Sequence, residues 1–171
     1  MYHLLALEDV LDCVALLSAM KYAIPESIHT RLPGMLSFAG GLCHTDGSIA
    51  CFNDAAEGIA LSPQYLFDFA IQFGYDIHEK WAFPDTGYYI LRDATTDSRM
   101  IIDCGVLGPR HNPGHAHCDA LSYELSVRGQ QLIMDSGTYE YQAGEWRDYF
   151  RSTRAHNTVS VDGQEQAELW G

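Results

Sequence analysis

The chain has 171 residues, of which 47% are hydrophobic and 12% aromatic, enough for one domain or two small ones with a sizeable core. Its formal net charge of −13 argues against a general nucleic-acid or membrane-surface binder, because phosphate contacts need Lys and Arg. No apolar run reaches the ~18 residues of a membrane span, and five cysteines without a C-x-x-C pair predict neither a disulfide framework nor a zinc ribbon.

The first part of the sequence has the apolar periodicity of helices. Residues 2–22 carry a broad apolar face and are followed by Pro25, which stops the predicted helix. Residues 26–42 predict a second helix, which contains Pro33 and ends at a glycine pair. Residues 62–74 predict a third, because a serine in the N-cap position precedes a proline and a glycine follows the last turn.

Further along, the period changes to that of short strands bounded by turns. Strands are expected at 87–93, 99–105, 121–129, 130–137 and 156–163. Because helices come first and strands follow without alternation, the pattern favours a helical region followed by an antiparallel β domain over a doubly wound sheet. Three helices cannot easily bury all their apolar faces alone, so we expect a fragment of a larger enzyme.

Imidazoles and carboxylates gather between two breaks rich in glycine and proline. His111, His115, His117 and Asp119 fall within nine residues, and Asp135 closes the next strand. In an extended segment, residues two apart point the same way, so His115, His117 and Asp119 can project together. The sequence therefore predicts a polar site at this end of the strands.

Such a cluster is able to bind zinc, since Zn²⁺ takes three or four N, O or S ligands. The candidate ligands are His117, Asp135 and His156, which would staple three strand segments. Two other interpretations stay open. In the first, the histidines are surface or hydrogen-bonded residues without a metal. In the second, the cluster is a metal hydrolase site in which Asp119 is the water-activating base.

A longer motif resembles a known family. The series G-H-x-H-x-D, D-x-G and R-S-T-x-A-H-N-T-V-x-V-D-G over residues 112–164 resembles the β-sandwich domain of the heparinase II/III-like and alginate-lyase-like polysaccharide lyases. The opening MYHLLALEDVL resembles a late helix of the (α/α) toroid of these enzymes, and HTDGSIACFNDA resembles the turn that closes it. The resemblance implies an α+β multi-domain fold, with residues 1–80 at the end of the toroid and residues 81–171 in an antiparallel β-sandwich, both incomplete.

The resemblance also implies roles for individual residues. His115 matches the active-site histidine, and Tyr2 matches the tyrosine that acts as general acid, base or both. The ligands of a mainly structural zinc are matched by His117, Asp135 and His156. Tyr139 and Arg151 are candidate substrate contacts, because aromatic faces stack on sugars and arginines attract an anionic polymer. A salt-bridged loop is the other interpretation of the arginine cluster at 147–154.

The function that follows from the resemblance is β-elimination on a uronic-acid-containing polysaccharide, an anionic partner. The C5 proton lies α to a carboxylate, so its removal needs a base, an acid for the leaving oxygen and donors for the developing negative charge. The family implies a periplasmic or secreted location. The alternative is a truncated, non-catalytic module that keeps a zinc-stapled sheet and affinity for sugar.

Overall fold

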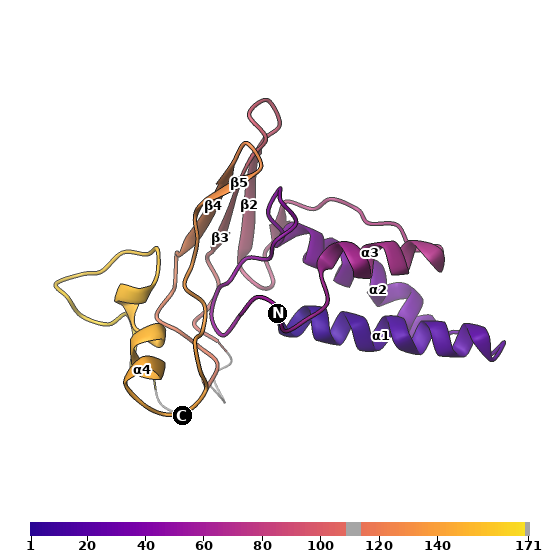
Figure 1. The fold of residues 1–171 in the computed structure, drawn as a ribbon, viewed down its shortest axis with the longest axis horizontal. Helices are drawn as coiled ribbons and strands as arrows, with labels where there is room; N and C mark the ends of the chain where they lie inside the picture. Colours follow the sequence, from indigo (N-terminus) through magenta and orange to yellow (C-terminus); the bar gives the residue numbers. More distant parts are fainter. Residues whose placement is uncertain (109–113, 170–171) are drawn as a thin grey trace.

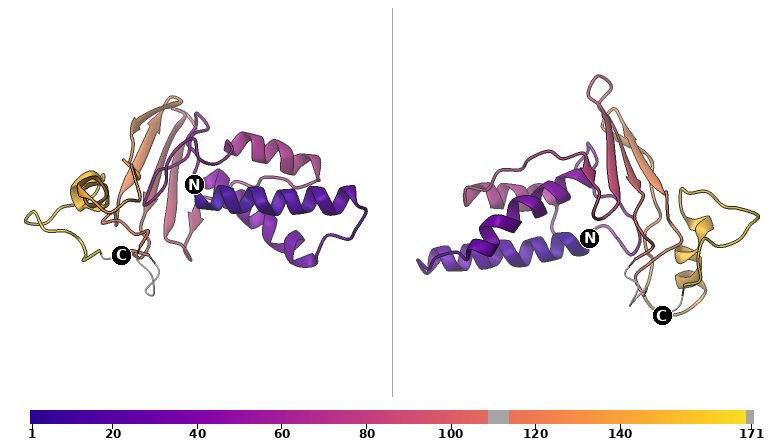
Figure 2. Two further views of the ribbon diagram at one scale, coloured as in Figure 1. Left: turned by 60° about the horizontal axis from the view of Figure 1, so that its bottom comes forward. Right: turned by 180° about the vertical axis from the view of Figure 1, so that it is seen from behind.

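The computed structural model describes residues 1–108 and 114–169. Three helices lie on one side of a small antiparallel sheet, and a short helix with the C-terminal segment lies on the other side (Figures 1 and 2). The chain therefore has the predicted order, a helical region followed by an antiparallel sheet.

The three predicted helices are confirmed as α1 (Tyr2–Ala19), α2 (Glu26–Gly41) and α3 (Pro63–Gln72). The hydroxyl of Ser62 caps α3 by accepting a hydrogen bond from the backbone nitrogen of Tyr65. Leucines and a valine at three- and four-residue spacing form one buried stripe on α1, which packs against α2 and α3: Leu4, Leu7, Leu11 and Val14. None of the helices in the described part of the chain is long and apolar enough to cross a membrane.

Five strands form the sheet in sequence order, each antiparallel to the next: β1 (Ala82–Phe83), β2 (Tyr88–Asp93), β3 (Ser98–Asp103), β4 (Tyr123–Val127) and β5 (Gln130–Ile133). A two-residue turn joins β4 and β5. Both of its residues, Arg128 and Gly129, have positive φ, which matches the twist of a tight hairpin. Four of the five predicted strands are thus confirmed, each shorter than predicted and β3 starting one residue earlier, and β1 was not predicted.

The prediction of a strand at 156–163 is wrong. This segment is irregular, with a single isolated bridge between Val161 and Gln164. Its contact with β4 is made by the side chain of Asn157, which donates to the carbonyl oxygen of Tyr123 at 3.2 Å, and a strand needs a ladder of backbone hydrogen bonds instead. The sequence also missed α4 (Glu145–Arg151) and the single 3₁₀ turn after it (Thr153–Ala155). At seven residues, α4 is too short to show a helical period.

Buried polar contacts join the helical half to the sheet. The side chain of Glu124 in β4 accepts from the backbone nitrogen of Cys51 at 2.6 Å and pairs with the Nε2 atom of His44 at 2.6 Å. The Arg99 guanidinium of β3 donates to the carbonyl oxygen of Gly40 at 3.1 Å. A second apolar cluster fills the same junction: Ala50, Phe52, Phe83, Ile90 and Ile101. These contacts fix the sheet relative to the helices.

Candidate active site

The candidate catalytic residues meet where the helical half joins the sheet. Tyr2 opens α1, which starts at this junction (Figure 1), and His115 lies in the segment that leads into β4. Their rings contact edge to face, with centroids 5.3 Å apart. Both reach solvent, since Tyr2 is 47% exposed and the His115 side chain 62% exposed. The structure therefore brings together the two residues that the sequence predicted as a catalytic pair.

A second tyrosine, Tyr141, supports this pair. The hydroxyl of Tyr2 donates to the hydroxyl of Tyr141 at 2.8 Å, and the latter donates to the backbone carbonyl oxygen of Asp54 at 3.2 Å. Desolvation, together with the hydrogen bond from Tyr2, raises the pKa of Tyr141, so its hydroxyl remains a donor. Tyr141 thus holds the hydroxyl of Tyr2 in place.

Asp54 is the hub of the site. It lies in the connection between α2 and α3 and is only 2% exposed. Its Oδ2 atom is 2.7 Å from Nδ1 of His115, and its Oδ1 atom is 2.8 Å from Nε2 of His117. One carboxylate of the helical half therefore binds both histidines of the H-x-H motif.

Arg147 compensates the charge of this carboxylate. Its Nη1 and Nη2 atoms donate to the two oxygens of Asp54, the second at 3.0 Å. The same guanidinium donates to Oγ1 of Thr138 and to the carbonyl oxygen of Gly114, both at 2.9 Å, and it lies over the ring of Tyr141. Its position on α4 explains why that short helix packs here.

The charge state of Asp54 follows from these contacts. Burial alone would raise the pKa of its carboxyl group, but the hydrogen bonds from His117, Arg147 and His115 outweigh burial and hold the pKa well below its ordinary value. Asp54 is therefore an ionised carboxylate that only accepts hydrogen bonds, so each residue that hydrogen-bonds to it must be the donor.

The predicted zinc ligands also lie together. The rings of His117 and His156 have centroids 5.2 Å apart, and Nδ1 of His156 is 2.8 Å from Oδ1 of Asp135. Asp135 also accepts from the hydroxyl of Ser122 at 2.8 Å and from the backbone nitrogen of Gly137 at 3.1 Å. Within residues 1–108 and 114–169, however, no three His, Cys, Asp or Glu side chains converge as a group able to hold a metal ion.

Two unpaired ring nitrogens in this cluster indicate whether its histidines are able to bind a metal ion. Nδ1 of His117 and Nε2 of His156 are buried and have no hydrogen-bond partner in the described part of the chain. Each ring uses its other nitrogen on a carboxylate, as metal-binding histidines commonly do. Burial also lowers the pKa of His117, against the opposing hydrogen bond to Asp54, and so favours the neutral ring that metals bind. The two histidines fit zinc.

Asp119, the base of the hydrolase interpretation, is buried. Burial raises the pKa of Asp119 to about 7, and its Oδ2 atom accepts from the backbone nitrogen of Asn53 at 2.8 Å. The contact ties the connection that carries Asp54 to the segment that carries the histidines. His111, the first histidine of the cluster, lies outside the described residues.

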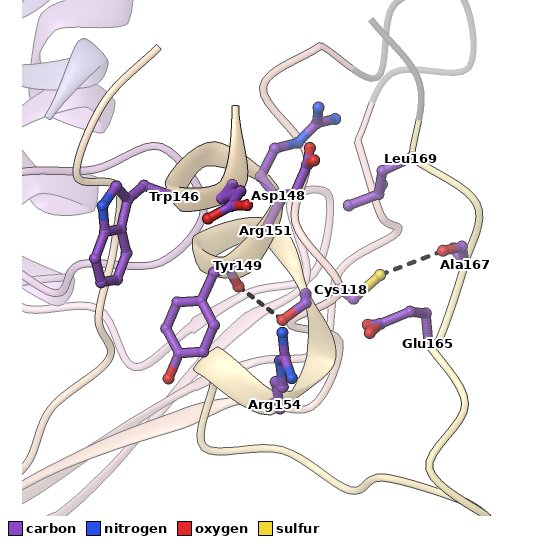
Figure 3. Close-up of a pocket in the computed structure, with 11 residues that line it drawn as sticks. Cys118, Trp146, Asp148, Tyr149, Arg151, Arg154, Glu165, Ala167 and Leu169 are labelled. Atoms are coloured by element: carbon purple, nitrogen blue, oxygen red, sulfur yellow. Dashed lines mark hydrogen bonds between the residues drawn. The ribbon is translucent and has the colours of Figure 1, made fainter. Parts of the chain in front are cut away.

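The two candidate substrate contacts have different settings. Tyr139 is exposed and stacks on Phe150, with ring centroids 5.8 Å apart. Arg151 is buried, and its Nε atom donates to the carbonyl oxygen of Ala116 at 3.0 Å. It lines a cavity of about 670 Å³ beside α4, together with Trp146 and Glu165 (Figure 3). This cavity carries acidic as well as basic side chains.

Sequence reasoning missed Asp54. It stands 61 and 63 residues before its two histidine partners, in a turn that matches no ligand spacing. Arg147 was considered only as part of a basic cluster or a salt-bridged loop, whereas its partner is Asp54. The only signal was the resemblance of HTDGSIACFNDA to the turn that closes the toroid of the family, because Asp54 lies within it.

Comparison with known proteins places the chain in a family. Residues 77–171, more than half of the chain, match the C-terminal domain of the heparinase II/III-like family. The heparin-sulfate lyase of Pedobacter heparinus is 26% identical over 87 residues, which are 48% of this chain and 13% of that protein.

Solved structures share the fold. A heparinase III superposes with a TM-score of 0.77 and 19% identity, covering 96% of this chain and 29% of the other. A heparan sulfate lyase from Pedobacter heparinus gives a TM-score of 0.76 and 18% identity, with the same coverage. This chain therefore spans less than a third of the length of these relatives. The family resemblance seen in the sequence is confirmed, and the chain belongs to the heparinase II/III-like family.

Proposed function

We propose that the chain is part of a polysaccharide lyase that cleaves a uronic-acid-containing polysaccharide by β-elimination. The observation that carries the proposal is the exposed pair of Tyr2 and His115, contributed by the two halves of the fold and backed by the buried pair of Asp54 and Arg147. The relatives named above are lyases of heparin or heparan sulfate, which supports an anionic polysaccharide as substrate.

The geometry suits the needs of the reaction. A base must take the C5 proton, and an acid must protonate the leaving oxygen at C4. The phenol of Tyr2 is the candidate for acid, base or both. His115 is anchored through Nδ1, and its ring reaches solvent, so it is placed to assist proton transfer or to neutralise the substrate carboxylate. Tyr139 and Arg151 remain the proposed substrate contacts.

We further propose that His117, Asp135 and His156 hold zinc. The unpaired Nδ1 of His117 and Nε2 of His156 support the proposal. Oδ1 of Asp135 accepts two hydrogen bonds and Oδ2 accepts one, which leaves a lone pair on Oδ2 for a metal. A zinc ion there would supply structural cross-linking of the segments after β3, after β5 and after α4.

The finer fold assignment belongs to the same proposal. Residues 1–80 are assigned to the end of an (α/α) toroid and residues 81–171 to a β-sandwich. Supporting this, the sheet face opposite Ile101 carries apolar side chains that are partly or largely exposed: Tyr89, Leu91, Met100, Ile102 and Leu125. A second sheet is the usual cover for such a face.

The alternative is a carbohydrate-binding module without turnover. A cluster of aromatic rings beside α4 favours it, since Tyr139 and Trp146 are exposed and their centroids lie 6.0 Å apart. Sugars stack on such faces without any chemistry.

One assay separates the two functions. The purified chain is incubated with heparan sulfate or alginate, and the ultraviolet absorbance of the unsaturated uronate product is followed while binding is measured by calorimetry. Product formation that Tyr2→Phe abolishes, and that Tyr65→Phe on the surface of α3 leaves intact, supports the lyase. Binding without product supports the module. A folded chain that does neither contradicts the module. For the lyase, of which this chain is a part, Tyr2→Phe and Tyr65→Phe are also compared in the whole enzyme, and unchanged product formation in Tyr2→Phe contradicts the proposal.

A further inference from the structure

The two histidines of the H-x-H motif meet one carboxylate through different ring nitrogens. His115 presents Nδ1 to Asp54 at 2.7 Å, whereas His117 presents Nε2 at 2.8 Å. The two oxygens of Asp54 are divided between them, one to each ring. A pair of chemically identical side chains, two residues apart, is therefore bound in opposite orientations.

We propose that Asp54 is the positioning residue that forces opposite tautomers on these histidines. A carboxylate only accepts hydrogen bonds, so each ring must place its hydrogen on the nitrogen that faces Asp54. A neutral His115 is then protonated at Nδ1 and keeps a lone pair on Nε2. A neutral His117 is protonated at Nε2 and keeps a lone pair on Nδ1.

Arg147 makes the arrangement obligatory. Its Nη1 and Nη2 atoms donate to both oxygens of Asp54, and the side chains of both residues are almost fully buried. A buried carboxylate paired with a guanidinium stays ionised, because protonation would leave the arginine charge without its counter-charge. Asp54 therefore has no hydrogen of its own to offer to either ring.

The backbone around Asp54 is held on both sides, so the carboxylate cannot move toward one histidine alone. The nitrogen of Asn53 donates to Oδ2 of Asp119 at 2.8 Å, and the carbonyl oxygen of Ala55 accepts from the nitrogen of Thr138 at 3.1 Å. The side-chain oxygen of Asn53 also accepts from the backbone nitrogen of His117 at 3.3 Å.

The opposite tautomers assign different tasks to the two rings. His117 is left with the lone pair on its buried, unpartnered Nδ1, where a metal ion can bind. His115 is left with the lone pair on Nε2, on a ring that reaches solvent, where it can accept a proton or a substrate hydrogen bond. These tasks rest on the proposed function, whereas the tautomers themselves do not.

The tautomers are measurable by long-range ¹H–¹⁵N correlation spectroscopy on the histidine-labelled 171-residue chain. Spectra are recorded after treatment with a chelator at about pH 8, above the ordinary histidine pKa of about 6.5. The signals are assigned by single His115→Gln and His117→Gln variants. The expected result is Nδ1 protonation of His115 and Nε2 protonation of His117. The same tautomer on both rings would overturn the proposal.

The Asp54→Asn variant sharpens the test. An asparagine has one accepting oxygen and one donating amide, so it satisfies only one ring in its original tautomer. We expect one histidine, and not the other, to switch tautomer, while Asp85→Asn at an exposed position changes neither. A folded Asp54→Asn chain in which both rings keep their tautomers would overturn the proposal. If the variant does not fold, the wild-type spectra still decide.

The outcome is independent of lyase activity. Opposite tautomers support the role of Asp54 whether or not the enzyme forms product, and loss of the proposed function leaves that role standing. Identical tautomers in a chain that produces unsaturated uronate would overturn the role of Asp54 and support the proposed function.

Discussion

Arg147 donates hydrogen bonds to both carboxylate oxygens of Asp54, although 93 residues separate them in the sequence. The pair joins α4, on one side of the sheet, to the connection between α2 and α3 on the other (Figures 1 and 2). It therefore links the short helix to the helical half of the fold, behind the candidate catalytic residues.

Removal of this arginine should destabilise the protein strongly. In Arg147→Ala the buried carboxylate of Asp54 loses its counter-charge, for which a cost of about 3–5 kcal/mol in the free energy of unfolding is expected. The matched control is Arg92→Ala, since Arg92 pairs with Glu79 at the surface, where about 0–1 kcal/mol is expected. Urea denaturation of both variants measures the difference. Equal losses would show that the buried pair has no special role.

Zinc should bind to the wild-type chain at about one ion per molecule, with His117 and His156 as ligands. Single His117→Ala and His156→Ala variants should lose the ion, whereas His78→Ala, at an exposed position, should retain it. Plasma mass spectrometry of the purified chains gives the metal content. A chelator should lower the melting temperature of the wild type and of His78→Ala, but not that of the two variants without zinc. A folded wild-type chain without zinc would refute the ligand assignment.

The hydroxyl of Tyr141 should matter more to the position of Tyr2 than to stability. Tyr141→Phe removes the hydroxyl that links Tyr2 to the carbonyl oxygen of Asp54, so about 0.5–1.5 kcal/mol of unfolding free energy should be lost. Turnover should fall more steeply than this, because the Tyr2 phenol is no longer oriented. Comparing kcat with the unfolding free energy of the same variant tests this. Unchanged turnover would rule out an orienting role.

Gly137, the glycine of the D-x-G motif, should not tolerate a side chain. It has a φ of +56°, and a Cβ atom would lie 2.2 Å from the carbonyl oxygen of Ala55. Gly137→Ala should therefore cost more than the roughly 1 kcal/mol expected for positive φ alone. Gly58→Ala is the control, since Gly58 also has positive φ but open space around it. Thermal unfolding compares the two, and equal shifts would contradict the close contact.

The sequence was sufficient for the features that depend on neighbouring residues. Helical spacing of leucines predicted α1, and the serine and proline before residue 64 predicted the start of α3. The H-x-H motif and the aspartate before Gly137 predicted a polar cluster, and the structure brings its members together. The strand prediction for 156–163 was wrong because an alternating pattern forms a strand only where its backbone can pair with a partner strand.

By itself, the sequence determined the three long helices, four of the strands and the family, since periodicity and motif carry that information. The resemblance to the family then named Tyr2, His115 and the candidate zinc ligands. Only the tertiary structure decided that Asp54 binds both histidines and that Arg147 neutralises it. These contacts join residues 61 to 93 positions apart. Which nitrogen of each histidine faces a carboxylate depends on how the helical half packs on the sheet, and no local pattern encodes that packing.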